Sequence, residues 1–152
     1  MVARTRFDTS DCPVARSVDA IGDWWSLLIV RDAFDGSRRF GEFQRSLGVA
    51  KNILAARLRT LVSGGILAAV PASDGSTYKE YVLTGRGEAL FPVIVALRQW
   101  GEQNFFAPDE PHSQLVDRRE GQVLRPLEVR SRDGRSLNPA DTTVYKVTAP
   151  ED

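Results

Sequence analysis

The residues of this chain best placed to do chemistry are six basic side chains that lie between positions 38 and 59. Within that stretch they face a single acid, Glu42, although the formal net charge of all 152 residues is zero. Guanidinium and ammonium groups gathered in this way can neutralise the phosphates of a nucleic acid. Charge alone leaves two interpretations open, a nucleic-acid interface or a solvated helix face. The six residues are Arg38, Arg39, Arg45, Lys51, Arg57 and Arg59.

Catalytic chemistry is not expected. The chain has one cysteine and one histidine, and it lacks the HExxH, GxSxG, P-loop and GxGxxG motifs. We therefore expect no enzyme activity, no metal and no cofactor. The lone cysteine, together with the absence of a secretory signal and of a long apolar run, predicts a cytoplasmic protein with no membrane partner.

Helical patterns account for the first part of the chain. Apolar residues at helical spacing predict helices at 12–22, 23–34, 38–47 and 50–63. Asp23 is expected to cap the second of these helices, and glycines separate or end the others. A short helix, a tight break and a further helix are typical of a helix-turn-helix motif.

The periodicity then changes from helical to alternating. Alternation predicts strands at 66–72 and 77–83, joined by a hairpin turn. Thr84 has the place of the cap of a long helix that runs from 85 to about 106. Pro92 permits a bend in that helix.

The pattern weakens beyond Pro108. Short strands are predicted at 115–129 and 144–147, and Asp133-Gly134 is predicted to be a hairpin turn between polar segments. We expect residues 107–152 to form a small β appendage or a loosely ordered tail.

The order of the elements predicts a mainly α fold with a small β component, a winged helix-turn-helix. The short third helix and the turn after it would hold the helix at 50–63 away from the core, where it can enter the major groove of DNA. Five apolar residues of that helix are expected to face inward: Ile53, Leu54, Leu58, Leu61 and Val62.

The outward face of the same helix carries the candidate base contacts. Lys51, Asn52 and Arg59 are predicted to lie outward or at the rim, and Arg57 near a boundary. Asparagine can pair with adenine and arginine with guanine, and each good bidentate contact gives about 1–3 kcal/mol of discrimination. These side chains therefore predict reading of a DNA sequence.

Phosphate contacts are expected from Arg38 and Arg39. They stand at the start of the predicted third helix, where free amides and the helix dipole favour an anion. A winged helix that serves only in protein–protein contact is a further interpretation. The basic cluster counts against it, and a hairpin with few basic residues counts for it.

The long helix carries more apolar surface than a small domain readily covers, so we expect it to form a dimer interface. Trp24 and Trp25 point about 100° apart on a helix and cannot both face one core. We expect Trp24 in the core and Trp25 at an interface or in a pocket for an aromatic ligand. The candidate interface or ligand residues are Trp25, Leu97, Trp100 and Phe105.

Five linked motifs of the chain resemble the HxlR family of bacterial transcription regulators, relatives of the MarR group. They are Cys12-Pro13 followed by DAIGDWWSLLIVRD, then RRFGEFQRSLG, AKNILAARLRTLVSGGIL, YVLTGRGEAL and LRQWG, within residues 12–103. The resemblance implies a homodimeric winged-helix regulator on a palindromic or near-palindromic DNA operator. It implies a DNA-binding and dimerisation domain at 1–106, with the interface built by segments 7–21 and 86–106. Our hypothesis is a repressor or an activator, with repression favoured.

The chain departs from the family pattern in two places. Family wings are usually rich in arginine, whereas Lys79 is the only basic residue of this hairpin, and the wing contacts are left to Ser73, Ser76, Thr77 and backbone amides. Longer relatives carry a zinc-ribbon-like knuckle with cysteine ligands. The corresponding stretches here keep their glycine turns without the thiols, so residues 107–152 resemble a knuckle without metal.

Cys12 occupies the position of a cysteine that some HxlR relatives use to sense electrophiles or oxidants. It is expected at a helix start, where the dipole favours a thiolate, with Arg16 one turn later. The alternative is a small apolar residue at the dimer interface. An effector-responsive sensor, signalled through Cys12 or through a bound aromatic molecule, is therefore the second hypothesis on function.

Overall fold

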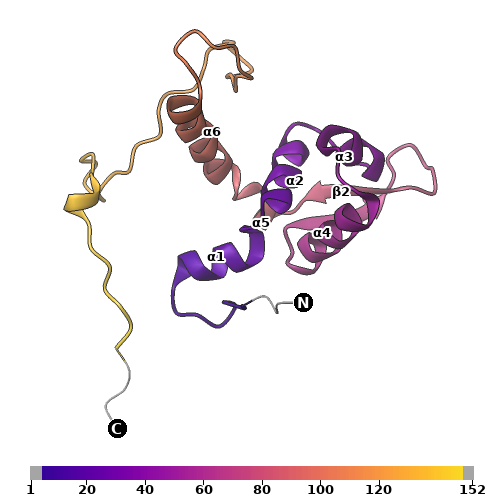
Figure 1. Ribbon diagram of the computed structural model, residues 1–152, viewed down its shortest axis with the longest axis horizontal. Coiled ribbons are helices and arrows are strands. Elements are labelled where there is room, and N and C mark those ends of the chain that lie inside the picture. The colour runs from indigo at the N-terminus through magenta and orange to yellow at the C-terminus, as the bar shows by residue number, and fades with distance from the viewer. Residues whose placement is uncertain (1–4, 149–152) are drawn as a thin grey trace. The chain divides into compact units, whose positions relative to one another are not determined.

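The computed structural model describes residues 5–148 of the chain, which divides into two compact units between Ile94 and Val95. The first unit contains four helices, a hairpin and a short fifth helix (Figure 1). The helices are α1 (Pro13–Ile21), α2 (Trp24–Phe34), α3 (Phe40–Leu47), α4 (Lys51–Ser63) and α5 (Gly85–Glu88), and the strands are β1 (Leu67–Pro71) and β2 (Lys79–Leu83).

Caps fix the helix starts where the sequence places them. The Asp23 carboxylate accepts a 2.8 Å hydrogen bond from the Ser26 amide and so begins α2. The Thr84 hydroxyl accepts from the Gly87 amide at 3.1 Å and begins α5. Both predicted caps are confirmed. Gly48 ends α3 in the left-handed region at φ 62°, a conformation that favours glycine, and so makes the tight turn before α4.

The core of the first unit lies between α2, α3, α4 and the hairpin. Its largest buried side chains are Phe43 of α3, Ile29 of α2 and a stripe on α4 made of Leu54, Leu58 and Leu61. The hairpin closes over this core as a two-stranded antiparallel sheet, in which Leu67 pairs with Leu83 and Pro71 with Lys79.

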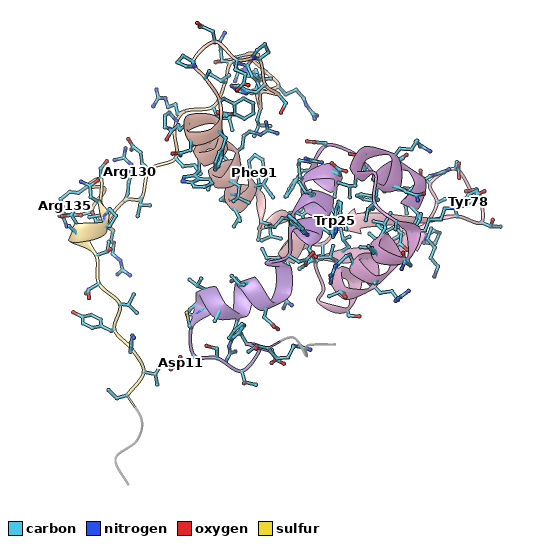
Figure 2. All side chains as sticks on the ribbon, viewed as in Figure 1. Asp11, Trp25, Tyr78, Phe91, Arg130 and Arg135 are labelled. Carbon is cyan, nitrogen blue, oxygen red and sulfur yellow. The ribbon has the colours of Figure 1, made fainter. Side chains whose placement is uncertain are left out.

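Two details of the predicted packing are wrong. Ile53 is 39% exposed, because the buried stripe of α4 begins one residue later, at Leu54. The two tryptophans have the opposite of their predicted positions: Trp24 is 76% exposed, and Trp25 packs against the core. Trp25 stands four residues before the buried Ile29 and shares its helix face, and Figure 2 shows it among the side chains around α2.

The single long helix predicted from 85 to about 106 is also wrong. The chain forms α5, breaks at Ala89-Leu90, and restarts as α6 (Phe91–Phe105). Pro92 has no amide hydrogen to bond to the carbonyl of Glu88, so continuing the helix started by Thr84 through Pro92 would be costly. Pro92 is accommodated as the second residue of a new helix, where no such bond is needed.

The second unit combines most of α6 with an extended chain and a short 3₁₀ helix, η1 (Pro139–Asp141). The strands predicted at 115–129 and 144–147 do not form. The described residues of the second unit hold only isolated bridges, Val116 to Val123 in the first segment and Arg130 to Ser136 beyond it. Pro126 interrupts the first segment, and a strand without a partner ladder is not stable. The predicted turn at Asp133-Gly134 is present.

Candidate nucleic-acid interface

The outward face of α4 is the first part of the candidate interface. With Leu54, Leu58 and Leu61 held in the core, Lys51, Asn52, Arg59 and Thr60 are exposed. Ala55 and Ala56 lie between Asn52 and Arg59, and their small side chains leave room for close approach of a partner. The exposure predicted for Lys51, Asn52 and Arg59 agrees with the structure, and their contact with DNA stays a prediction.

Arg57 differs from the other basic residues of α4. Its Nε lies 3.5 Å from Oδ1 of Asp23, the carboxylate that caps α2, and its side chain is only partly exposed. The ion pair joins α4 to the start of α2, so Arg57 points toward the protein instead of the outward stripe. Its contact with DNA bases stays a prediction.

Arg38 and Arg39 precede α3 and are paired with acids of the hairpin. Arg38 Nε lies 2.6 Å from Oε2 of Glu80, and Arg39 Nη2 lies 2.5 Å from Oδ2 of Asp74. The Glu42 carboxylate accepts hydrogen bonds from the amides of Arg38 and Arg39 at 2.7 and 3.3 Å, which fixes this segment at the helix start.

Glu80 is the hub of this network and is only 3% exposed. Its Oε1 accepts from both the amide and the hydroxyl of Ser73 at 2.9 Å, while Oε2 accepts from Arg38. These donors hold the pKa of Glu80 below its usual range, the Ser73 amide most of all. The hairpin is further tied to the α3 segment because the Tyr81 amide donates to the Arg38 carbonyl at 2.7 Å.

Asp74 lies at the tip of the turn, where the hydrogen bond from Arg39 lowers the pKa of its carboxyl and the Ser76 amide adds to the effect. The same contact raises the pKa of the Arg39 guanidinium. The sequence patterns did not single out either acid: Asp74 lies within the predicted hairpin turn, and Glu80 within the strand predicted at 77–83. A glutamate on the same strand face as Tyr78 and Val82 is the signal that could have pointed to a cationic partner.

The hairpin, or wing, presents few cations of its own. Thr77 and Lys79 are exposed, and Ser76 is half-buried with its amide bonded to Asp74. Tyr78 projects from the wing (Figure 2), with the Arg39 guanidinium 5.9 Å from its ring centre. A cleft of about 520 Å³ between α3 and the wing is lined by Arg39, Arg45, Lys79 and neighbouring aromatic residues.

Exposed apolar side chains mark α1 and α6. Val14 and Val18 of α1 are exposed, as are the predicted interface residues Leu97, Trp100 and Phe105 of α6. Trp100 and Phe105 form an edge-to-face pair with ring centres 5.1 Å apart. Trp25, the fourth predicted member, packs against the core of the first unit instead.

Cys12 is a free, exposed thiol at the N-cap of α1. Arg16, one turn later, donates from its Nε to the carbonyl of Ser10. The Cys12 amide is bonded to the Ser10 hydroxyl at 3.1 Å. The thiol therefore stands beside a fixed loop, and its predicted sensing role stays a prediction.

The second unit contains a separate pocket of about 240 Å³. The Gln99 side chain shapes it by bonding to the Arg125 carbonyl at 3.0 Å and the Leu127 amide at 2.8 Å. Gly121 and Gly134 keep the two predicted turns at φ 68° and 91°. Across residues 5–148 no group of three or more metal-ligating side chains comes together, and no helix of that range is long and apolar enough to cross a membrane.

Three packed helices, the last of which presents an outward face after a tight turn, and a two-stranded hairpin define the winged helix-turn-helix class of DNA-binding domains. The comparisons with known proteins agree. The model of the HxlR-like helix-turn-helix family matches residues 20–109. The HTH-type transcriptional regulator Mb3122 of Mycobacterium bovis is 37% identical over 130 residues, covering 86% of this chain and 82% of its own length.

Solved structures give the same result. PA1607, a candidate transcription factor, is 59% identical with a TM-score of 0.89 and covers 94% of this chain and 100% of its own. The redox regulator HypR in its reduced form is 32% identical with a TM-score of 0.57, covering 61% of this chain and 93% of its own. The chain belongs to the HxlR-like helix-turn-helix family and is a transcription regulator with a helix-turn-helix DNA-binding domain.

Proposed function

We propose that the protein is a cytoplasmic homodimeric repressor that binds a near-palindromic operator through α4. The observation that carries this proposal is the exposed stripe of Lys51, Asn52 and Arg59 on a helix whose opposite side is locked into the core. A helix fixed in this way presents its polar face without losing side-chain packing, as entry into the major groove requires.

The three parts of the proposed interface, which are α4, the segment before α3 and the wing, make different kinds of contact with DNA. Asn52 and Arg59 read base edges, and Lys51 at the helix start contacts a base or the adjoining phosphate. Arg38 and Arg39 contact phosphates beside the groove. Ser76, Thr77 and Lys79 place the wing on the flanking backbone, a weak contact because a single lysine supplies its charge.

A dimer follows from the size of a half-site. One α4 reads only a few base pairs, so tight binding needs a second α4 about one helical turn away along the DNA. The exposed apolar residues of α1 and α6 supply surface that a second copy would cover. Leu97, Trp100 and Phe105 are the proposed contacts on α6.

The test is DNA binding measured by fluorescence anisotropy on the region upstream of the protein's own gene, at 50 mM KCl. The double variant Asn52→Ala with Arg59→Ala should lose about 2–6 kcal/mol of operator affinity, since each bidentate contact gives about 1–3 kcal/mol. Arg118→Ala, an exposed arginine of the second unit, is the charge control and should bind as wild type. Wild-type affinity in the double variant would refute the role of α4.

Redox control is a second candidate function, favoured by the exposed thiol of Cys12 and by the likeness to the redox regulator HypR. Two Cys12 thiols of a dimer would lose two hydrogen atoms to an oxidant such as diamide, which becomes the hydrazine, and form one disulfide. Non-reducing electrophoresis and operator affinity before and after diamide test this. Equal responses of wild type and Cys12→Ser would remove it.

A further inference from the structure

The two arginines before α3 have acid partners of very different kinds. Glu80, the partner of Arg38, is 3% exposed and accepts three hydrogen bonds at fixed positions. Asp74, the partner of Arg39, has a side chain that is 54% exposed and stands on a surface turn. The Arg38–Glu80 contact is therefore part of the internal hydrogen-bond network of the wing, whereas the Asp74 carboxylate that binds Arg39 faces solvent.

The Arg39–Asp74 pair lies where a DNA phosphate is expected. Arg39 is a proposed phosphate contact, and its guanidinium lines the cleft between α3 and the wing together with Arg45 and Lys79. A carboxylate and a phosphate present the same oxygen acceptors to a guanidinium. In the free protein the position beside Arg39 Nη2 is filled by the Asp74 carboxylate at 2.5 Å.

We propose that Asp74 competes with DNA for Arg39: its carboxylate holds the guanidinium in the free protein and is replaced by a backbone phosphate on binding. The inference rests on the proposed function and assigns Asp74 a role in setting DNA affinity. No covalent bond changes, since one anionic acceptor replaces another on the same N–H donors. Asp74 thereby weakens binding to any DNA and leaves the choice of sequence to α4.

Exchange is feasible because the Asp74 carboxylate is exposed and the Arg39 side chain is half-buried rather than enclosed. Exposed ion pairs contribute little, so a phosphate can displace the carboxylate, and removal of the competitor should raise affinity by about two- to fivefold. The displaced carboxylate also stays beside a phosphate of like charge, which adds to the gain when it is removed. The Arg39–Asp74 pair has no net charge. In Asp74→Asn the guanidinium keeps only its longer contact with Glu80 Oε1, at 3.8 Å, and the salt dependence should steepen by up to about 0.9 in log K against log[salt].

The experiment compares wild type with Asp74→Asn by fluorescence anisotropy from 50 to 300 mM KCl, on operator and on unrelated duplex DNA. Asparagine suits the same turn, since it forms the same local hydrogen bonds. Asp133→Asn is the matched control, because Asp133 also stands in an exposed Asp-Gly turn, 3.1 Å from an arginine, and its replacement changes the net charge equally. Arg39→Ala, alone and with Asp74→Asn, completes the cycle.

We expect Asp74→Asn to bind both DNAs two- to fivefold more tightly than wild type, with an unchanged ratio of operator affinity to unrelated-DNA affinity. In a protein that also carries Arg39→Ala, Asp74→Asn should raise affinity no more than Asp133→Asn does. Affinity equal to that of Asp133→Asn, a loss of affinity, or an equal gain without Arg39 would each overturn the inference while leaving the proposed function intact. No binding of any DNA by wild type at 50 mM KCl would overturn both.

Discussion

Replacing Trp100 by alanine should weaken the proposed homodimer by a large factor. The side chain is 58% exposed on α6 and is held by an edge-to-face contact with Phe105, so it is presented in a fixed orientation. In a twofold dimer the same residue is lost from both sides of the interface.

The magnitude follows from the exposed area. The surface area of a tryptophan is about 250 Å². An exposed fraction of 58% therefore corresponds to about 145 Å² per protomer and about 290 Å² per dimer. At about 25 cal/mol per Å², complete coverage corresponds to about 7 kcal/mol and half coverage to about 3.5 kcal/mol. Because binding retains only part of such a gain, we expect a rise of about 10²- to 10³-fold in the dimer dissociation constant.

Sedimentation equilibrium over a range of protein concentrations measures this constant directly. Tyr78→Ala is the matched control, since Tyr78 is an aromatic residue of similar exposure that stands on the wing. Its dimer should dissociate as wild type does. A Trp100→Ala protein with the wild-type dissociation constant, or a wild type that is monomeric at high concentration, would refute the assignment of α6 to the interface.

Other predictions concern stability and are checked by urea unfolding. Leu58→Ala on α4 should cost about 2–5 kcal/mol, because the side chain is fully enclosed and its removal leaves a cavity, and a loss below about 1 kcal/mol would contradict that packing. Gly87→Ala should destabilise the first unit, since an added Cβ would lie 2.2 Å from the Ile66 carbonyl oxygen, whereas Gly101→Ala, with open space at that position, should not. The pKa of Glu42 is lowered by the amides of Arg38 and Arg39, so its stabilising effect is complete above the unfolded value of about 4.3 and is lost as pH falls through the lower folded value. Glu42→Gln should therefore flatten the decline in stability between about pH 5 and pH 2, and an unchanged profile would speak against this.

Local sequence signals predicted most of the first unit because they act over a few residues. The Asp23 and Thr84 caps bond to amides three positions away, and the Gly48 turn depends on one residue's backbone. The apolar stripe of α4 repeats every three or four residues, which is enough to expose Asn52 and Arg59. The helix-turn-helix and the outward face of α4 were therefore readable before any tertiary contact was known.

Local sequence signals were weaker where two alternative structures fit the same pattern of residues. Adjacent tryptophans satisfy the helical pattern equally well whichever one faces the core, and the packing around Ile29 decided for Trp25. The apolar stripe runs from Ala89 through Trp100 without a break at Pro92, so it did not show that a new helix begins at Phe91. In the second unit, alternation suggested strands, but no partner ladder forms among the residues that the structure describes.

The sequence by itself determined the class of the protein: the order of the helices, the hairpin and the basic cluster between positions 38 and 59. Only the tertiary structure decided what that cluster does in the free protein. Arg38 meets Glu80 across 42 positions of the chain, and Arg39 meets Asp74 across 35. No periodicity encodes such pairs, because they depend on how the hairpin folds back against α3, and that approach is fixed by the packing of the whole core.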